Sequence, residues 1–138
     1  MSLSPHADVD TAADLRLVVP DADAVSLPVA LRYRVVDPFA VTVAFSGAEV
    51  SVEWVFARDL LLTGLTQPCG EGDVRVWPSW RSGKDLVLIA LSSPDGRAVL
   101  EANAGDLRAF LDATVRLVRP GTESDHVDLD AELAGLLH

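Results

Sequence analysis

The stretch VSVEWVFARDLLLTGLT, from Val50 to Thr66, decides the fold. In its first half Val52, Trp54 and Phe56 point to one side and the residues between them to the other, which is typical of a strand with one buried face. From there on, apolar residues recur at spacings of three and four, which predicts a short helix that ends at Gly64. No other stretch of the chain concentrates as much apolar surface. We expect it to form the core, and it contains no group arranged for chemistry.

Segments in which apolar and polar residues alternate lie on both sides of this stretch and are separated by turn residues. A tight connection before the stretch predicts a hairpin with the preceding strand. Together they predict an α+β fold with an antiparallel sheet of about seven strands, one inserted helix and two C-terminal helices. The predicted strands are Leu15–Val19, Val29–Val36, Ala40–Ser46, Val50–Phe56, Asp73–Trp77, Leu86–Leu91 and Arg97–Ala102.

The two C-terminal helices follow from a change to helical spacing after residue 102. Asn103 is the predicted N-cap of the first, whose apolar stripe runs from Leu107 to Val115. Asp128 or Asp130 would cap the second. Its leucine stripe either closes the core of its own domain or docks on a neighbour. We expect a flexible acidic arm over residues 1–14 and a single domain over residues 15–138.

Charge and composition narrow the classes of function. The 138-residue chain has 11 Lys and Arg against 21 Asp and Glu, a formal net charge of −10. Surfaces that bind phosphates need clustered positive charge, so nucleic acid and anionic lipid are disfavoured partners. The longest apolar run, Leu86–Leu91, is too short to cross a bilayer, and the N-terminus has no signal-peptide pattern. With the single cysteine, these features predict a cytoplasmic protein.

The sequence shows no convincing catalytic or metal-binding motif, and we expect no cofactor. The best metal candidate is Asp125–Asp130, whose acids alternate around His126. It lacks the glycine turn and the distal glutamate of a calcium loop, so a polar loop that ends in a helix cap is favoured. Cys69 has no histidine near it in sequence, which favours an inert thiol over a nucleophile.

The segment Arg75–Arg81, RVWPSWR, is the best candidate for a partner contact. If Val74 and Val76 face the core, Trp77 faces away from it, and tryptophan with arginine is the composition of interface hot spots. The alternative is that Trp77 packs under a helix on the second face of the sheet. The predicted contact residues are Arg75, Trp77, Trp80 and Arg81.

Eight segments, taken in order, resemble the SsgA-like family of sporulation and cell-division proteins of actinobacteria, with the greatest similarity to its SsgB branch. The resemblance runs from about Leu15 to Leu137, and VEWVFARDLL and GDVRVWPS are its most specific parts. The segments are LRLVVP, LPVALRYRVVDPFAV, VEWVFARDLLLTGL, GDVRVWPS, IALSSPDGRAVLEA, LRAFLDAT, RPGTES and DLDAEL.

This resemblance implies a non-enzymatic protein of sporulation-specific cell division that helps localise the tubulin-like GTPase FtsZ to septum sites. It also implies a cytoplasmic protein that concentrates at the septum alongside SsgA-type proteins, with a Whirly-like fold assembled as a homotrimer. The alternative, by analogy of fold, is a single-stranded nucleic-acid-binding module, against which the acidic balance argues. A small-molecule or enzymatic role would need a convergent polar pocket.

Overall fold

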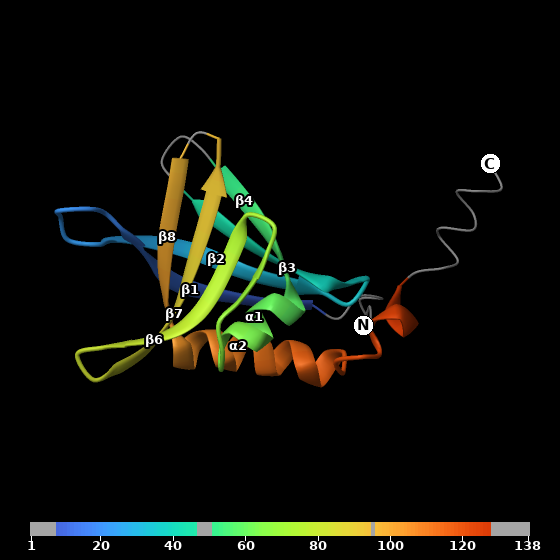
Figure 1. The fold of residues 1–138 in the computed structure, drawn as a ribbon. Coiled ribbons are helices and arrows are strands. Elements are labelled where there is room, and N and C mark those ends of the chain that lie inside the picture. Colours follow the sequence, from blue (N-terminus) through green and yellow to red (C-terminus); the bar gives the residue numbers. More distant parts are fainter. Residues whose placement is uncertain (1–7, 47–50, 95, 128–138) are drawn as a thin grey trace.

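The computed structural model describes residues 8–46, 51–94 and 96–127, which form one sheet with helices packed against it (Figure 1). The elements in chain order are β1 (Asp8–Val18), β2 (Val25–Arg34), β3 (Asp37–Ser46), β4 (Ser51–Ala57), α1 (Arg58–Gly64), β5 (Cys69–Glu71), β6 (Val74–Arg81), β7 (Lys84–Ser93), β8 (Gly96–Asn103), α2 (Ala104–Leu117) and the 3₁₀ helix η1 (Glu123–His126).

The sheet has eight strands in the order β4-β3-β2-β1-β8-β7-β6-β5, every neighbouring pair is antiparallel, and it curls into a half-barrel. Two four-stranded halves meet where β1 pairs with β8. Only three residue pairs form this junction, between Arg16–Val18 and Val99–Glu101. The hairpins β1–β2 and β6–β7 project from the same side of the molecule (Figure 1, left).

The core fills the inner face of the curled sheet. Alternate residues of the strands point inward, and α1 and α2 add Leu60, Leu61, Leu107 and Phe110 from the open side. Since alternation places every second residue on one face, the remaining residues of each strand form an outer face. Both α-helices therefore lie on the inner face, and the outer face is not covered by either of them.

Most of the predicted architecture is confirmed. The α+β class, the antiparallel sheet, the β3–β4 hairpin, the short helix that ends at Gly64 and the helix after Asn103 are all present. The side-chain oxygen of Asn103 accepts a hydrogen bond from the backbone N–H of Asp106 at 3.0 Å, as expected of an N-cap. The predicted last helix begins at Asp128 or later and lies outside the described residues.

One expectation was wrong, and the expected number of strands was one too low. Strand β1 begins at Asp8, so residues 8–14 are not an arm: they pair with β2 along their whole length. The sheet has eight strands where about seven were expected, because Cys69–Glu71 forms a short strand, β5, beside β6. The stretch from Val50 to Thr66 supplies Phe56, Leu60 and Leu61 to the core, as expected, although its strand, β4, lies at an edge of the sheet.

Helix α1 packs so closely on β6 that its last residue has no room for a side chain. A Cβ atom at Gly64 would lie 2.1 Å from Cγ1 of Val76, which is fully buried. The glycine that the sequence indicates as a helix stop is therefore also required by close packing.

Arg58, the first residue of α1, ties together the ends of three elements. Its guanidinium is fully buried and donates to the carbonyl oxygens of Thr114 (3.1 Å) and Val118 (2.7 Å), at the C-terminal end of α2. It pairs with Glu123 of η1 at 3.0 Å and lies 5.1 Å from the ring centre of Tyr33. A cation at the C-terminus of a helix interacts favourably with the helix dipole.

Candidate functional site

Strand β6 divides the four predicted contact residues between its two faces. Arg75, Trp77 and Arg81 alternate with core residues and lie on the outer face, as expected from the inward direction of Val76. Trp80 lies on the opposite face of the strand, beyond the core, and is 67% exposed. The structure thus brings three of the four together and places the second tryptophan on the other side of the hairpin.

Trp77 is half-buried in the outer face without joining the core. Its neighbour across the sheet is Leu88 of β7, which in turn lies opposite Glu101 of β8. Both described helices pack on the inner face, so Trp77 does not lie under either of them.

A buried carboxylate, Glu101, also lies on this outer face. It is only 2% exposed and forms an ion pair with Arg81, whose side chain reaches to it across β7. The pair fixes the position of a predicted contact residue. Sequence reasoning missed Glu101, although its alternation with the apolar residues of β8 could have placed it on the face away from the core.

A hollow of about 400 Å³ opens beside Trp77, where β5 meets β6. Its lining includes Arg75, Trp77, Ala90, Pro68 and Cys69. The thiol of Cys69 donates a hydrogen bond to the carbonyl oxygen of Leu60 at 3.2 Å. Burial raises the pKa of the Cys69 thiol, so it stays protonated at neutral pH and is a poor nucleophile.

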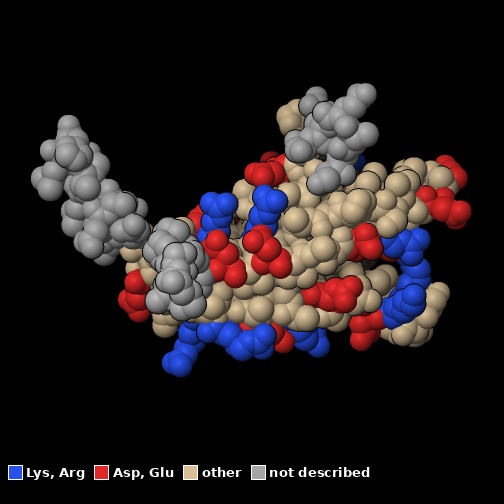
Figure 2. All heavy atoms as spheres, turned by 180° about the vertical axis from the view of Figure 1, so that it is seen from behind, with Lys and Arg blue, Asp and Glu red and all other residues tan. Residues whose placement is uncertain are grey.

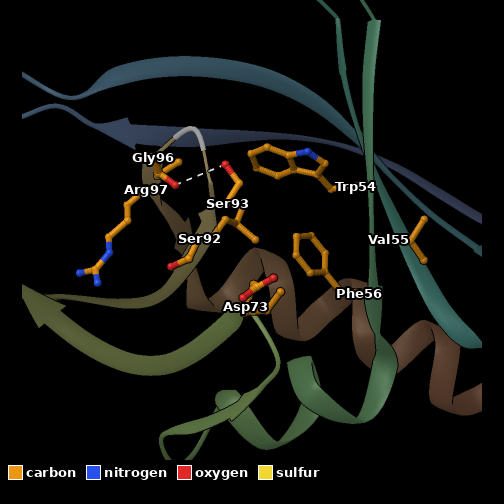
Figure 3. A pocket seen from close by; sticks show the side chains of 11 residues that line it. Trp54, Val55, Phe56, Asp73, Ser92, Ser93, Gly96 and Arg97 are labelled. Carbon is orange, nitrogen blue, oxygen red and sulfur yellow. Dashed lines mark hydrogen bonds between the residues drawn. The ribbon is translucent and has the colours of Figure 1, made fainter.

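A second hollow, of about 450 Å³, separates edge strand β4 from the ends of β7 and β8. Figure 3 shows Trp54 and Phe56 pointing into it from β4, whereas Val55 points away. Trp54 also packs edge-on against Phe45, with ring centres 5.1 Å apart. Val74, Leu91 and Ala98 line the hollow as well, so its walls are mainly apolar.

The described residues provide neither a group of metal ligands nor a membrane-spanning helix. Within residues 8–46, 51–94 and 96–127, no three His, Cys, Asp or Glu side chains are grouped so that they could hold a metal ion. Residues 125–127 of the metal candidate lie in η1 and just after it, and Asp128–Asp130 lie outside the described ranges. No helix in the described part of the chain is long and apolar enough to cross a membrane.

Charged side chains are spread unevenly over the surface. On the back of the molecule, basic groups gather between the tips of the β1–β2 and β6–β7 hairpins and along the edge formed by α2 (Figure 2). Elsewhere acids and bases are interspersed: Arg32 lies 3.5 Å from Asp10 and 3.7 Å from Glu53. These exposed pairs contribute little stability, since solvent screens them.

Comparison with known proteins gives a consistent match. The family model described as "Streptomyces sporulation and cell division protein, SsgA" matches residues 27–123. The chain is 56% identical over 124 residues to sporulation-specific cell division protein SsgB of Streptomyces coelicolor, with 89% of this chain and 90% of that protein covered. It is 45% identical over 140 residues to SsgB of Salinispora tropica, with 99% and 98% covered.

Two solved structures show the same fold. One, from work on SsgB mutations that correlate to longitudinal cell division during sporulation of Streptomyces coelicolor, superposes with a TM-score of 0.84 at 51% identity and covers 91% of this chain and 99% of that one. The other is an SsgA-like sporulation-specific cell division protein from Thermobifida fusca, with a TM-score of 0.87 at 46% identity and 98% of both chains covered.

Proposed function

The chain belongs to the SsgA family of sporulation and cell division proteins, and from this premise we propose that it is a non-enzymatic adaptor that helps recruit FtsZ to septum sites during sporulation. The observation that carries the proposal is similarity over nearly the whole chain to proteins named as sporulation-specific cell division proteins. The Cys69 thiol, which burial keeps protonated, is in line with a non-enzymatic role.

The proposal includes the cellular setting and the assembly. The protein acts in the cytoplasm, concentrates at the division septum and works alongside SsgA-type proteins. It forms a homotrimer of Whirly-like subunits. An adaptor of this kind gains from several copies, because linked binding sites turn weak single contacts into tight attachment.

The proposed contacts with the division machinery are Arg75, Trp77 and Arg81 on the outer face, together with Trp80 at the hairpin. Exposure supports Trp80, and a half-buried position beside a hollow supports Trp77. Tryptophan and arginine dominate the binding energy of many interfaces.

The direct test is a pull-down of purified FtsZ with the full chain and with the variants Trp77→Ala and Trp80→Ala. The wild-type chain is expected to retain FtsZ, and each variant is expected to retain less. Val55→Ala removes an apolar side chain that is 63% exposed, against 67% for Trp80, from β4 at the other end of the strand order, and serves as the control. A wild-type chain that does not bind FtsZ overturns the recruiting role.

Two further results separate the adaptor from its alternative. If both tryptophan variants bind FtsZ as well as the wild type does, the role stands and the contact residues are wrong. Salt-sensitive binding of a single-stranded oligonucleotide in a gel shift, without FtsZ binding, would support a nucleic-acid-binding module instead.

A further inference from the structure

One half of the outer face of the sheet has a charge opposite to that of the protein as a whole. We call it the cationic face: the outer side of β6, β7 and β8 with the adjoining end of β1. It carries Arg16, Arg75, Arg81, Lys84 and Arg97, all exposed. On β6, β7 and β8 its one acidic side chain is Glu101, which is buried and paired with Arg81. This balance contrasts with a net charge of −10 for the chain.

The cations surround an apolar centre. Trp77, Leu88 and Val99 occupy the middle of the face and are each half-buried. Arg75 and Arg97 lie towards one end of the strands and Arg81 and Lys84 lie at the other. The rise per residue in a strand places Arg75 and Arg81 about 20 Å apart along β6.

The hollow beside Trp77 gives this face a place for an anchor. Its volume of about 400 Å³ is at the lower end of the range for ligand sites and is ample for one large side chain. Arg75 lines the same hollow, so a charged group next to the anchor would meet a guanidinium. Arginine binds carboxylates with two parallel hydrogen bonds.

We propose that the cationic face binds an acidic segment of a partner protein that carries one large apolar side chain between its carboxylates. The apolar side chain enters the hollow beside Trp77, and carboxylates on either side of it meet Arg75 and Arg97 at one end of the face and Lys84 at the other. The inference rests on the proposed adaptor function and adds the chemistry of the partner to it.

The composition of the face favours a protein segment over a nucleic acid. Sites for single strands stack successive bases on several aromatic side chains. Here Trp77 is the aromatic residue among the outward-facing residues of β6, β7 and β8, and its neighbours Leu88, Ala90 and Val99 are aliphatic. Aliphatic side chains suit the burial of an apolar anchor, whose transfer from water supplies affinity without base stacking.

The test measures binding of a fluorescein-labelled peptide of glutamates and serines with one central phenylalanine, by fluorescence anisotropy at low salt. Arg75→Glu in the full chain is expected to weaken binding about tenfold, which corresponds to the loss of one charged contact. Replacing the phenylalanine with serine is expected to weaken it by a similar factor, because the anchor is lost.

The control is Arg108→Glu on the exposed side of α2, which changes the net charge of the chain by the same amount. It is expected to alter the affinity less than twofold. Far-UV circular dichroism and urea unfolding would check that Arg75→Glu and Arg108→Glu are folded. Because Arg75 is exposed, its replacement leaves the core intact, and Arg97→Glu gives an independent second variant on the same face.

Three results would overturn the inference. The first is that Arg108→Glu weakens peptide binding as much as Arg75→Glu does. The others are that the serine peptide binds as tightly as the phenylalanine peptide, or that a single-stranded oligonucleotide of matched charge binds more tightly than the peptide. The FtsZ pull-down separates this outcome from failure of the adaptor role. FtsZ retention that survives Arg75→Glu removes the docking face and leaves recruitment standing. Peptide binding without FtsZ retention would leave the docking face standing and remove the recruiting role.

Discussion

At the scale of single residues, Arg58 shows how a charge becomes part of the core. The sequence places it at the change from strand to helix, where an exposed arginine would be ordinary. In the structure it is fully buried and bonds to two carbonyl groups and one carboxylate. Its Nε has no hydrogen-bond partner among the described residues, so one N–H group of the guanidinium is buried without an acceptor. Burying a charge costs free energy, and these partners offset that cost.

Replacing Arg58 with methionine is expected to destabilise the protein by about 3–5 kcal/mol, because Glu123 and the carbonyl groups of Thr114 and Val118 would remain buried without their donor. Urea unfolding followed by circular dichroism measures the change. Arg108→Met, at an exposed position of α2, is the control and should change stability by less than about 0.5 kcal/mol. A similar small effect for both variants would contradict the structural role of Arg58.

The partner of Arg58 predicts a dependence of stability on pH. The backbone N–H of Glu123, followed by Arg58 and Gly121, lowers the pKa of the Glu123 carboxyl below its ordinary value of 4.5, although burial acts in the opposite direction. A lowered pKa in the folded state adds stability above the unfolded pKa, and this stability is lost as the pH falls through the folded pKa.

Glu123→Gln is therefore expected to be less stable than the wild type at pH 7, and the difference should shrink once the pH falls below about 4.5. Urea unfolding at a series of pH values measures it. A difference that stays constant across this range would show that the charge of Glu123 does not contribute. Glu53→Gln, an exposed partner of Arg32, is the matched control.

At the scale of elements, the sequence predicted what alternation and spacing determine locally. The face of Trp77, the cap at Asn103 and the β3–β4 hairpin follow from a few neighbouring residues, and all are present. The same alternation continues into β1, where Val9, Thr11 and Ala13 point inward. These residues are small and are separated mostly by acids, so the sequence of this segment looks like that of a polar arm. Strand β5 has three residues, too few to show a period.

The edge position of β4 and the burial of Arg58 could not be predicted in the same way. Both depend on contacts between segments far apart in the chain: β4 pairs with β3 alone, and Arg58 bonds to residues more than fifty positions away. The ion pair of Arg81 with Glu101 is another example, since it joins two strands across a third. Local sequence patterns carry no information about such pairs.

The close contact between α1 and β6 predicts a steric effect. Gly64→Ala is expected to destabilise the protein by about 1–3 kcal/mol, because the added methyl group would overlap Val76. Thermal or urea unfolding measures the loss. The double variant with Val76→Ala removes the 2.1 Å contact with Cγ1 and keeps the 2.8 Å contact with Cβ, so the combined loss should be smaller than the sum of the two single losses. Strictly additive losses would contradict the contact.

At the scale of the whole molecule, the described chain presents a curled sheet with a covered inner face and an open outer face. Exposed apolar residues lie on β4 and at the β6–β7 hairpin, including Val52, Val55 and Trp80. Scattered exposed apolar residues are normal, but those on a sheet edge favour pairing with another chain.

Light scattering on the purified full chain is expected to give three times the mass of one chain, in agreement with the proposed trimer. The mass should stay constant on dilution through the micromolar range if the assembly is permanent. A clean monomer would contradict the trimer and would leave the adaptor with one binding site per molecule, so that avidity could not strengthen its contacts.

The two halves of the sheet are joined to each other through the pairing of β1 with β8, and this junction sets the angle between them. Three residue pairs form a narrow hinge, whereas β1 and β2 pair over ten residues. Helix α2 contacts β1, β7 and β8, so it bridges this hinge and acts as a brace across it. Helix α1 crosses the junction as well, because it contacts β3 and β4 in one half and β5 and β6 in the other. The angle between the halves therefore depends on how both helices are packed, and a partner that bound to either helix would act on both halves at once.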